Sequence, residues 1–442
     1  MTYPVVIKYL NSFTNYEKNT NYSYKKDLKL ARIRGFLLLL GNPQDALRII
    51  HVSGTKGKGS TCVFVAYILR AAGFSVGLYS SPHLNDFRER IRILWPSLRD
   101  SKLKTKYFEG MISKGALLSL VKELKPLINK YNRYSKYGHL SFFEVYTALA
   151  LLYFKRKRID FVVLETGLGG RLDATNAANS LVCGITPISS EHVQKLGKTL
   201  SKIAAEKAGI IKKDRQIVIS ACQASLVRKV ISNRCRKFHS TLYAVGREIK
   251  YFKSKQGFVI QGLCKNYKNL RLRLLGEHQM ANASLAVGLV EGISFYGFKI
   301  NMQAIRRGLY NAVWPGRCEV ISRGPVVILD GAQNVASAMV LRNAIKANFK
   351  YKKLILVLGV SADKDIAGIC KILDPLADEI ILTQADTSRA MAASKLSGYF
   401  KRKLYLTESV KKAKFLAGSL AQKNDLVLVT GSLFAVGEYR NA

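Results

Sequence analysis

The chain has 442 residues, 48% hydrophobic and 23% charged, a balance typical of folded globular proteins that excludes a disordered chain. Its length predicts two or three domains. The formal net charge of +42 is compatible with a nucleic-acid partner, an acidic membrane surface or anionic substrates. We favour a fourth interpretation, basic residues spread over solvated faces, because no nucleic-acid-binding motif accompanies them.

The sequence shows no pattern typical of a membrane span, a signal peptide or a set of paired cysteines. No apolar run approaches the length that spans a bilayer, and the N-terminal region contains Glu17 and Asp27 in place of an apolar signal-peptide core. The seven cysteines are scattered and include no C-x-x-C pair. The sequence therefore predicts a cytoplasmic protein with reduced thiols, without a membrane partner, a disulfide framework or a zinc site.

Apolar, β-rich runs alternate with helical patterns, which predicts a wound α/β fold with mostly parallel strands. Strands are expected at 49–53, 75–79, 161–166, 182–188, 217–221, 326–330, 354–360, 379–383, 404–407 and 426–430. Helices are expected at 61–72, 142–154, 200–208, 279–296, 335–348 and 410–422. Two further stretches are expected to be an irregular β region at 240–275 and a basic surface loop around 102–106. A boundary near 297–301 would divide the chain into domains at 1–299 and 300–442, the second with five strands of its own.

The most informative motif is the glycine-rich loop 54–60, which lies between an apolar run ending at Val52 and an amphipathic run starting at Thr61. A strand, a glycine-rich turn and a helix in this order form a phosphate cradle. Backbone N–H groups and the helix N-terminus converge on the anion, and Lys58 adds a full positive charge. The loop is shorter than the generic P-loop pattern. A flexible turn is the alternative interpretation.

Oxygen and imidazole groups follow several predicted strands: Ser81, Glu165, His192 and Asp330. Ligands of open α/β sheets bind beyond the carboxyl ends of the strands. These side chains suit a Mg²⁺ ion that is bridged to nucleotide phosphates. For Glu165, a role as a helix-cap acceptor is the structural alternative.

Motifs along nearly the whole chain resemble the Mur ligase superfamily, and within it folylpolyglutamate synthase and its bifunctional form with dihydrofolate synthase. They lie at 40–43, 54–60, 79–84, 88–91, 141–144, 164–176, 205–210, 276–279, 314–317, 330–334 and 429–432. The resemblance implies a P-loop-type wound ATPase domain, like the Mur ligase central domain, that binds ATP and folate. A smaller Rossmann-like glutamate-ligase domain would follow it.

The resemblance also implies roles for individual residues. ATP would be bound by Gly54, Thr55, Lys56, Gly57, Lys58, Gly59 and Ser60, with Asn282 at the adenine, Arg317 at a phosphate and Asp330 at the ribose. Ser81 and Glu165 would hold one Mg²⁺, and Glu165 with His192 a second. Lys207 aligns with a lysine that CO₂ carbamylates in this family. The catalytic residues would be Lys58, Glu165, His192 and Lys207. Phe142 and Phe143 would contact the pterin, with core packing as the alternative.

The implied reaction has two steps. A folate carboxylate attacks the γ-phosphate of ATP, giving an acyl phosphate and ADP, and the amine of L-glutamate then displaces phosphate. The protein would act by positioning and electrostatics rather than through a covalent nucleophile. The acceptor could be tetrahydrofolate, dihydropteroate or both, and a monomer is expected. A ligase for a cell-wall precursor and a non-catalytic, nucleic-acid-binding relative are the alternative hypotheses.

Two positions depart from the family pattern. Glu191 stands where the family usually has Asp before the metal-binding histidine, so the carboxylate has a longer reach. Gln333 replaces His in the motif Asp-Gly-Ala-His-Asn. Glutamine still donates a hydrogen bond, but it carries no proton charge.

Overall fold

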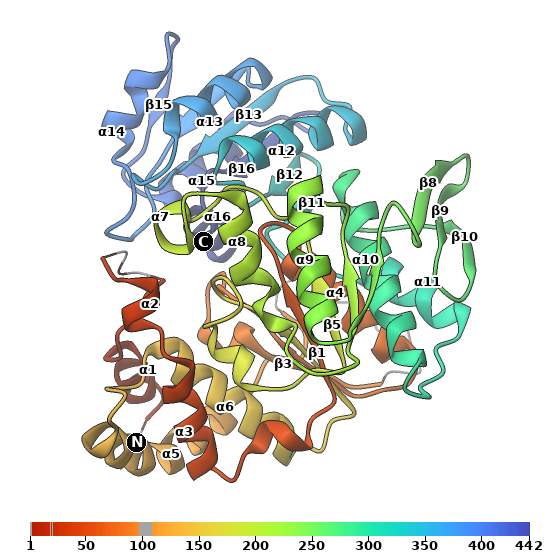
Figure 1. Cartoon of the computed structure of the whole chain (residues 1–442). Coiled ribbons are helices and arrows are strands. Elements are labelled where there is room, and N and C mark those ends of the chain that lie inside the picture. Colours follow the sequence, from red (N-terminus) through yellow and green to blue (C-terminus); the bar gives the residue numbers. More distant parts are fainter. Residues whose placement is uncertain (1, 18, 20, 97–107) are drawn as a thin grey trace.

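The structure is a computed structural model that describes residues 2–17, 19, 21–96 and 108–442, so the basic stretch at 102–106 lies outside the described residues. Two wound α/β bodies make up the chain, with the C-terminal body, drawn in blue, above the first (Figure 1). A small sheet projects from the side of the first body. The predicted α/β class with mostly parallel strands is confirmed.

Seven described strands form the first sheet, in the order β3-β2-β4-β1-β5-β6-β7. Their bounds are β1 Ile49–Ser53, β2 Val76–Tyr79, β3 Ile91–Leu94, β4 Phe161–Glu165, β5 Val182–Ile185, β6 Ile217–Ser220 and β7 Thr241–Ala244. Neighbouring strands are parallel except for β2 and β3. The central strands are buried along their whole length, as expected where helices cover both faces of a parallel sheet.

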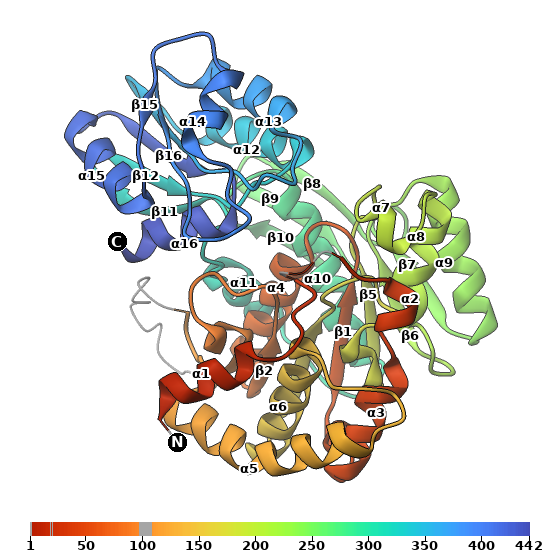
Figure 2. The ribbon, with the colours of Figure 1, turned by 90° about the vertical axis from the view of Figure 1, so that its left-hand side faces the viewer.

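Helices cover both faces of this sheet (Figure 2). On one face lie α4 Lys58–Ala71 and α10 His278–Ser294, with α11 Met302–Asn311 packed on α4. On the other lie α1 Tyr3–Asn11, α3 Leu30–Leu39, α5 Lys114–Tyr134 and α6 Phe142–Arg156, and beside them α8 Leu200–Lys207 and α9 Ser225–Lys237. Two single-turn helices are α2 Tyr24–Asp27 and α7 Val193–Leu196.

The predicted β region at 240–275 divides between two sheets. β7 is the edge strand of the first sheet, whereas the rest forms a three-stranded antiparallel sheet. Its strands are β8 Lys250–Ser254, β9 Gly257–Gln261 and β10 Asn266–Leu270.

Six described strands form the C-terminal sheet, in the order β11-β12-β16-β13-β14-β15. They are β11 Glu319–Arg323, β12 Val326–Leu329, β13 Leu354–Leu358, β14 Glu379–Leu382, β15 Tyr405–Leu406 and β16 Leu426–Thr430. Its helices are α12 Val335–Asn348, α13 Ile366–Leu373, α14 Ala393–Leu396, α15 Val410–Leu420 and α16 Leu433–Asn441. The prediction of five strands was one short, because the antiparallel edge strand β11 is polar and half exposed.

The two bodies pack closely against each other. A Cβ atom placed on Gly437 of α16 would lie 2.4 Å from Oδ1 of Asn85, which leaves no room for a larger residue. Leu84, Trp314 and Val436 belong to one continuous apolar cluster that crosses from one body to the other. Since α11 packs on α4, residues just beyond 300 contact the first body, and the division at 299/300 stays a prediction. Within the part of the chain that the structure describes, none of the helices has both the length and the apolarity needed to cross a membrane.

Candidate active site

The phosphate loop connects β1 to α4. The helix begins at Lys58, not at the predicted position 61, so Lys58, Gly59 and Ser60 form its first turn. Gly57 precedes it with φ of 84°, a conformation that favours glycine. A Cβ atom there would also lie 2.3 Å from Oδ1 of Asn282. The unpaired N–H groups of this first turn are suited to binding an anion.

The segment that follows β5 holds the phosphate loop in place. The backbone N–H of Thr55 donates to the carbonyl of Pro187 at 3.0 Å, and the Thr55 hydroxyl accepts from the N–H of Ser189 at 3.1 Å. Nζ of Lys56 lies 2.6 Å from Oε1 of Glu191. The predicted cradle and the stretch that carries His192 therefore form one unit.

Two lysines converge on the carbonyl oxygen of Gly54. Nζ of Lys207 donates to it at 2.7 Å, and Nζ of Lys58 lies 3.4 Å away. The Lys207 side chain is 3% exposed, and burial, together with the charge of Lys58, lowers its pKa to about 7. Near neutral pH, a substantial fraction of Lys207 is therefore an uncharged amine.

Glu165, at the end of β4, is a buried carboxylate that has few interactions to offset the cost of burying its charge. Its Oε2 accepts a hydrogen bond from the backbone N–H of Ser81 at 3.3 Å. Burial raises the pKa of Glu165 to about 6, an effect that Lys58 only partly offsets. A cation beside this carboxylate would offset the unfavourable burial, and a carboxylate with a serine oxygen fits Mg²⁺.

His192 lies between Glu191 and the start of α7, with a left-handed backbone at φ of 53°. Partial enclosure, with the charges of Lys207 and Lys58, lowers the pKa of His192, so its imidazole is neutral and able to bind a cation. Among the described residues, no three His, Cys, Asp or Glu side chains are grouped closely enough to hold a metal by themselves. Ser81 and Glu165 are in contact, whereas the metal set with His192 stays a prediction.

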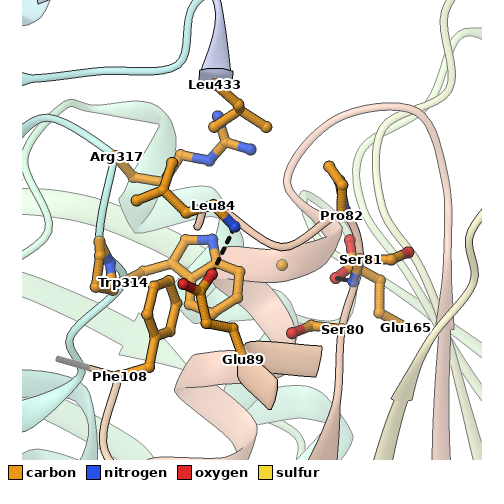
Figure 3. A pocket seen from close by; sticks show the side chains of 12 residues that line it. Ser80, Ser81, Pro82, Leu84, Glu89, Phe108, Glu165, Trp314, Arg317 and Leu433 are labelled. Atoms are coloured by element: carbon orange, nitrogen blue, oxygen red, sulfur yellow. Dashed lines mark hydrogen bonds between the residues drawn. The ribbon is translucent and has the colours of Figure 1, made fainter. Parts of the chain in front are cut away.

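A pocket opens between the two bodies at this point (Figure 3). Arg317 and Leu433 of the C-terminal part face Ser81 and Glu165 across it. It is lined by Gly59, Ser80, Ser81, Pro82, Leu84, Glu89, Phe108, Glu165, Trp314, Pro315, Arg317 and Leu433. The predicted phosphate contact Arg317 is thus in the same pocket as the predicted metal ligands Ser81 and Glu165.

Sequence reasoning gave Glu89 and Phe108 no place in the site. The Glu89 carboxylate accepts hydrogen bonds from the N–H groups of Leu84 and Asp86 at 2.5 and 2.9 Å, and so shapes the pocket wall. The pattern Asp86-x-x-Glu89, a capping box, was a usable signal for Glu89. No sequence signal marked Phe108.

The predicted adenine and ribose contacts lie on separate elements. Asn282 of α10 is buried against the phosphate loop and donates from Nδ2 to Oε1 of Gln279 at 3.0 Å. Asp330, after β12, accepts from the N–H groups of Cys318 and Ala332, each at 2.8 Å. Burial raises the pKa of Asp330, and its carboxylate fixes the two loops that border the second sheet.

The two predicted pterin contacts differ in environment. Phe142 has no exposed surface and packs against Phe87 and Tyr146, with the Arg90 guanidinium 5.2 Å from its ring centre. Phe143 is half-buried and lies against Gly167, in the loop after β4. Phe142 therefore lies within the core, whereas Phe143 packs against the loop after β4, and a pterin contact for either residue stays a prediction.

Comparison with known proteins identifies the family. The family model for the Mur ligase middle domain matches residues 114–290, and that for the glutamate ligase domain of Mur ligases matches residues 316–433. The chain is 32% identical to the dihydrofolate synthase/folylpolyglutamate synthase of Bacillus subtilis, over 93% of this chain and 94% of the relative. It is 31% identical to the protein of that name from Escherichia coli, over 97% and 94%.

Solved structures give the same result. The folylpolyglutamate synthase of Mycobacterium tuberculosis complexed with ADP has a TM-score of 0.86 and 30% identity, over 99% of this chain and 97% of that one. E. coli FolC in complex with DHPP and ADP has a TM-score of 0.83 and 30% identity, over 99% and 96%. The chain belongs to the dihydrofolate synthase/folylpolyglutamate synthase family of Mur ligases.

Proposed function

We propose that this protein is an ATP-dependent ligase that joins L-glutamate to a folate through an acyl phosphate, releasing ADP and phosphate. One observation carries the proposal: the pocket between the two bodies gathers Gly59 of the phosphate loop, Ser81, Glu165 and Arg317. A carboxylate is a poor electrophile, so amide formation needs prior phosphorylation. A pocket with cationic and N–H donors around one space suits phosphoryl transfer.

The phosphates of ATP would be bound by Lys58, Lys56 and the N–H groups of loop 54–60, with Arg317 approaching from the other body. Ser81 and Glu165 would hold one Mg²⁺, and Glu165 with His192 a second. When bound, Mg²⁺ supplies positive charge that neutralises the phosphate oxygens. Asn282 would contact the adenine and Asp330 the ribose. Closure of the bodies at residues 1–299 and 300–442 would complete the site and exclude water.

Lys207 is the proposed site of carbamylation. Its neutral amine would attack CO₂, forming an N–C bond and releasing one proton, which leaves an anionic carbamate. The lowered pKa of about 7 supports this chemistry, because only the uncharged amine is nucleophilic. The anion would sit close to Lys58, whose charge would stabilise it.

On the folate side, Phe143 would contact the pterin, with Phe142 behind it. The acceptor would be dihydropteroate, tetrahydrofolate or both. The relatives' names, dihydrofolate synthase/folylpolyglutamate synthase, and the FolC complex with DHPP and ADP support a folate-type acceptor. We further propose that the protein works as a monomer. Neither Glu191 nor Gln333 removes a group that the proposed chemistry requires.

Incorporation of radiolabelled L-glutamate tests the proposal, with ATP, Mg²⁺ and either dihydropteroate or tetrahydrofolate. Incorporation with both acceptors would establish a bifunctional enzyme, and with tetrahydrofolate alone a polyglutamate synthase. If folded protein incorporates glutamate with neither acceptor, the folate proposal is wrong. Assays with a cell-wall precursor, and of salt-dependent DNA binding without ATP turnover, would then test the alternatives.

A further inference from the structure

One carboxylate oxygen links the phosphate loop to the C-terminal body. Oε1 of Glu191 lies 2.6 Å from Nζ of Lys56 and accepts a hydrogen bond from Nδ2 of Asn334 at 3.4 Å. Lys56 belongs to the phosphate loop, whereas Asn334 is the N-cap residue of α12. The contact thus joins residues from three segments that are far apart in the sequence.

The Asn334 side chain is fixed by its own helix. Its Oδ1 accepts from the N–H of Ser337 at 2.9 Å, which caps the first turn of α12. With the oxygen turned to the helix, the amide NH₂ points away from it and reaches Glu191. The direction of this donor is therefore set by the capping interaction, and rigid α12 carries it.

Hydrogen bonds connect the segment before Glu191 to the phosphate loop. Backbone and hydroxyl hydrogen bonds from Thr55 to Pro187 and Ser189 hold the preceding residues against that loop. The Lys56–Glu191 pair is partly exposed, so the attraction of its charges is screened by solvent, and its main effect is directional. The carboxylate fixes where the Lys56 ammonium lies, and it does so at the boundary between the two bodies.

We infer that Glu191 is a positioning residue that couples the placement of the Lys56 ammonium to the position of the N-terminus of α12. The inference rests on the proposed function, since it assigns the coupling to ATP binding. The Glu191 side chain reaches both Lys56 and Asn334 through the same carboxylate oxygen. Without the hydrogen bond between Glu191 and Asn334, the Lys56 ammonium is present but its position is no longer tied to that of α12.

Three variants separate this coupling from helix capping. N334S keeps a capping oxygen but is too short to reach Glu191, and N334D keeps the cap while placing a second carboxylate beside it. In E191Q/N334D the hydrogen bond is restored with donor and acceptor exchanged. N301S is the matched control, because Asn301 caps α11 in the same way, with Oδ1 accepting from Ala304 at 2.7 Å, outside the candidate site.

The readout is the Kd for the non-hydrolysable ATP analogue AMPPCP with Mg²⁺, measured by calorimetry. We expect N334S to weaken binding about 5-fold and N334D about 30-fold, and E191Q/N334D to recover most of the N334D loss. N301S should bind like the wild type, and all the single variants should unfold at similar temperatures.

The inference is overturned if N334S and N334D bind within twofold of the wild type, or if E191Q/N334D binds no better than N334D. Because AMPPCP binding needs no folate, these outcomes are independent of the glutamate assay. A wild type that binds AMPPCP but makes no product would contradict the proposed function and leave the coupling intact.

Discussion

Two regions of the molecule differ in whether their buried charged side chains have an ion-pair partner. Between α3 and α6, Nε of Arg32 lies 2.9 Å from both carboxylate oxygens of Glu144, and the hydroxyl of Ser141 donates to the same group at 2.7 Å. At the carboxyl edge of the first sheet, Glu165 accepts one backbone N–H and Lys207 donates to one carbonyl. Among the described residues, neither of these two has an ion-pair partner within 4 Å.

The presence or absence of an ion-pair partner distinguishes buried charges that stabilise the fold from buried charges that serve a ligand. Removing one member of a compensated buried pair is strongly destabilising, because it leaves the other charge buried and unpaired. A buried charge without compensation destabilises the free protein, and such a group is expected where a ligand later supplies the opposite charge. Glu165 and Lys207 thus mark the site on energetic grounds as well as by position.

The largest effect is expected for E165Q, which should lower kcat by about 10³-fold because a proposed metal ligand is lost. Without ligands it should also be more stable than the wild type at pH 7.5, by about 2 kcal/mol. The pKa of Glu165 is raised to about 6, so the folded state holds this proton more tightly than the unfolded state. The free energy of unfolding of the wild type therefore falls as pH rises through about 4.5 to 6. E165Q does not show this fall, because glutamine does not ionise. Denaturant unfolding and steady-state kinetics measure the two effects; a destabilised E165Q would contradict the contrast.

R32A should show the reverse pattern. Removal of the guanidinium leaves Glu144 buried and unpaired, which should lower the free energy of unfolding by about 3–5 kcal/mol. In the protein that remains folded, kcat should stay within about threefold of the wild type, since Arg32 is not part of the proposed machinery. Urea unfolding and the glutamate assay check both. The matched double variant R32M/E144Q should lose less stability than R32A.

K207M should lower kcat by about 10²-fold. In the wild type the neutral amine fraction rises as pH increases through about 7, the lowered pKa of Lys207, so activity should increase over this range and depend on dissolved CO₂. Comparing CO₂-depleted buffer with buffer that contains bicarbonate separates this effect from the titration of Glu165. Equal wild-type activity in the two buffers would exclude carbamylation.

The smallest effect is expected for D330N. Asn at this position accepts from only one of the two N–H groups of Cys318 and Ala332, so the loops beside the second sheet lose a hydrogen bond. We expect KM for ATP to rise about tenfold with kcat little changed. An unchanged KM would show that these loops do not bind ATP.

Regular, buried elements were predictable from the sequence. The strands β1 and β16 have the predicted bounds, because full burial makes their apolar patterns continuous. Helix α12 also has the predicted bounds, and its buried residues Ala338, Leu341 and Ile345 recur at helical spacing. β3 was missed because Arg90 and Arg92, which are buried on pairing with Glu17 and the Glu109 carbonyl, look like surface residues in the sequence. Helix α5 was not predicted, although its buried residues Leu117, Leu120, Val121, Leu124 and Ile128 recur at helical spacing.

The site was predictable as a set of motifs, but not as an arrangement. Gly59 of the phosphate loop, Ser81, Glu165 and Arg317 line one pocket, and all four lie in motifs that the sequence singled out, whereas their roles stay predictions. The contact between Glu191 and Asn334 had no sequence signal, since it depends on how two bodies pack. The low pKa of Lys207 likewise follows from burial, which spacing along the chain does not reveal.

The most direct measurement follows oxygen from the acceptor carboxylate. Dihydropteroate, or tetrahydrofolate if only that is used, is labelled with ¹⁸O in the carboxylate that receives glutamate, and the released phosphate is analysed by mass spectrometry. Activation by ATP predicts that each turnover transfers one ¹⁸O atom to phosphate. Unlabelled phosphate formed together with the glutamate conjugate would contradict the acyl-phosphate mechanism.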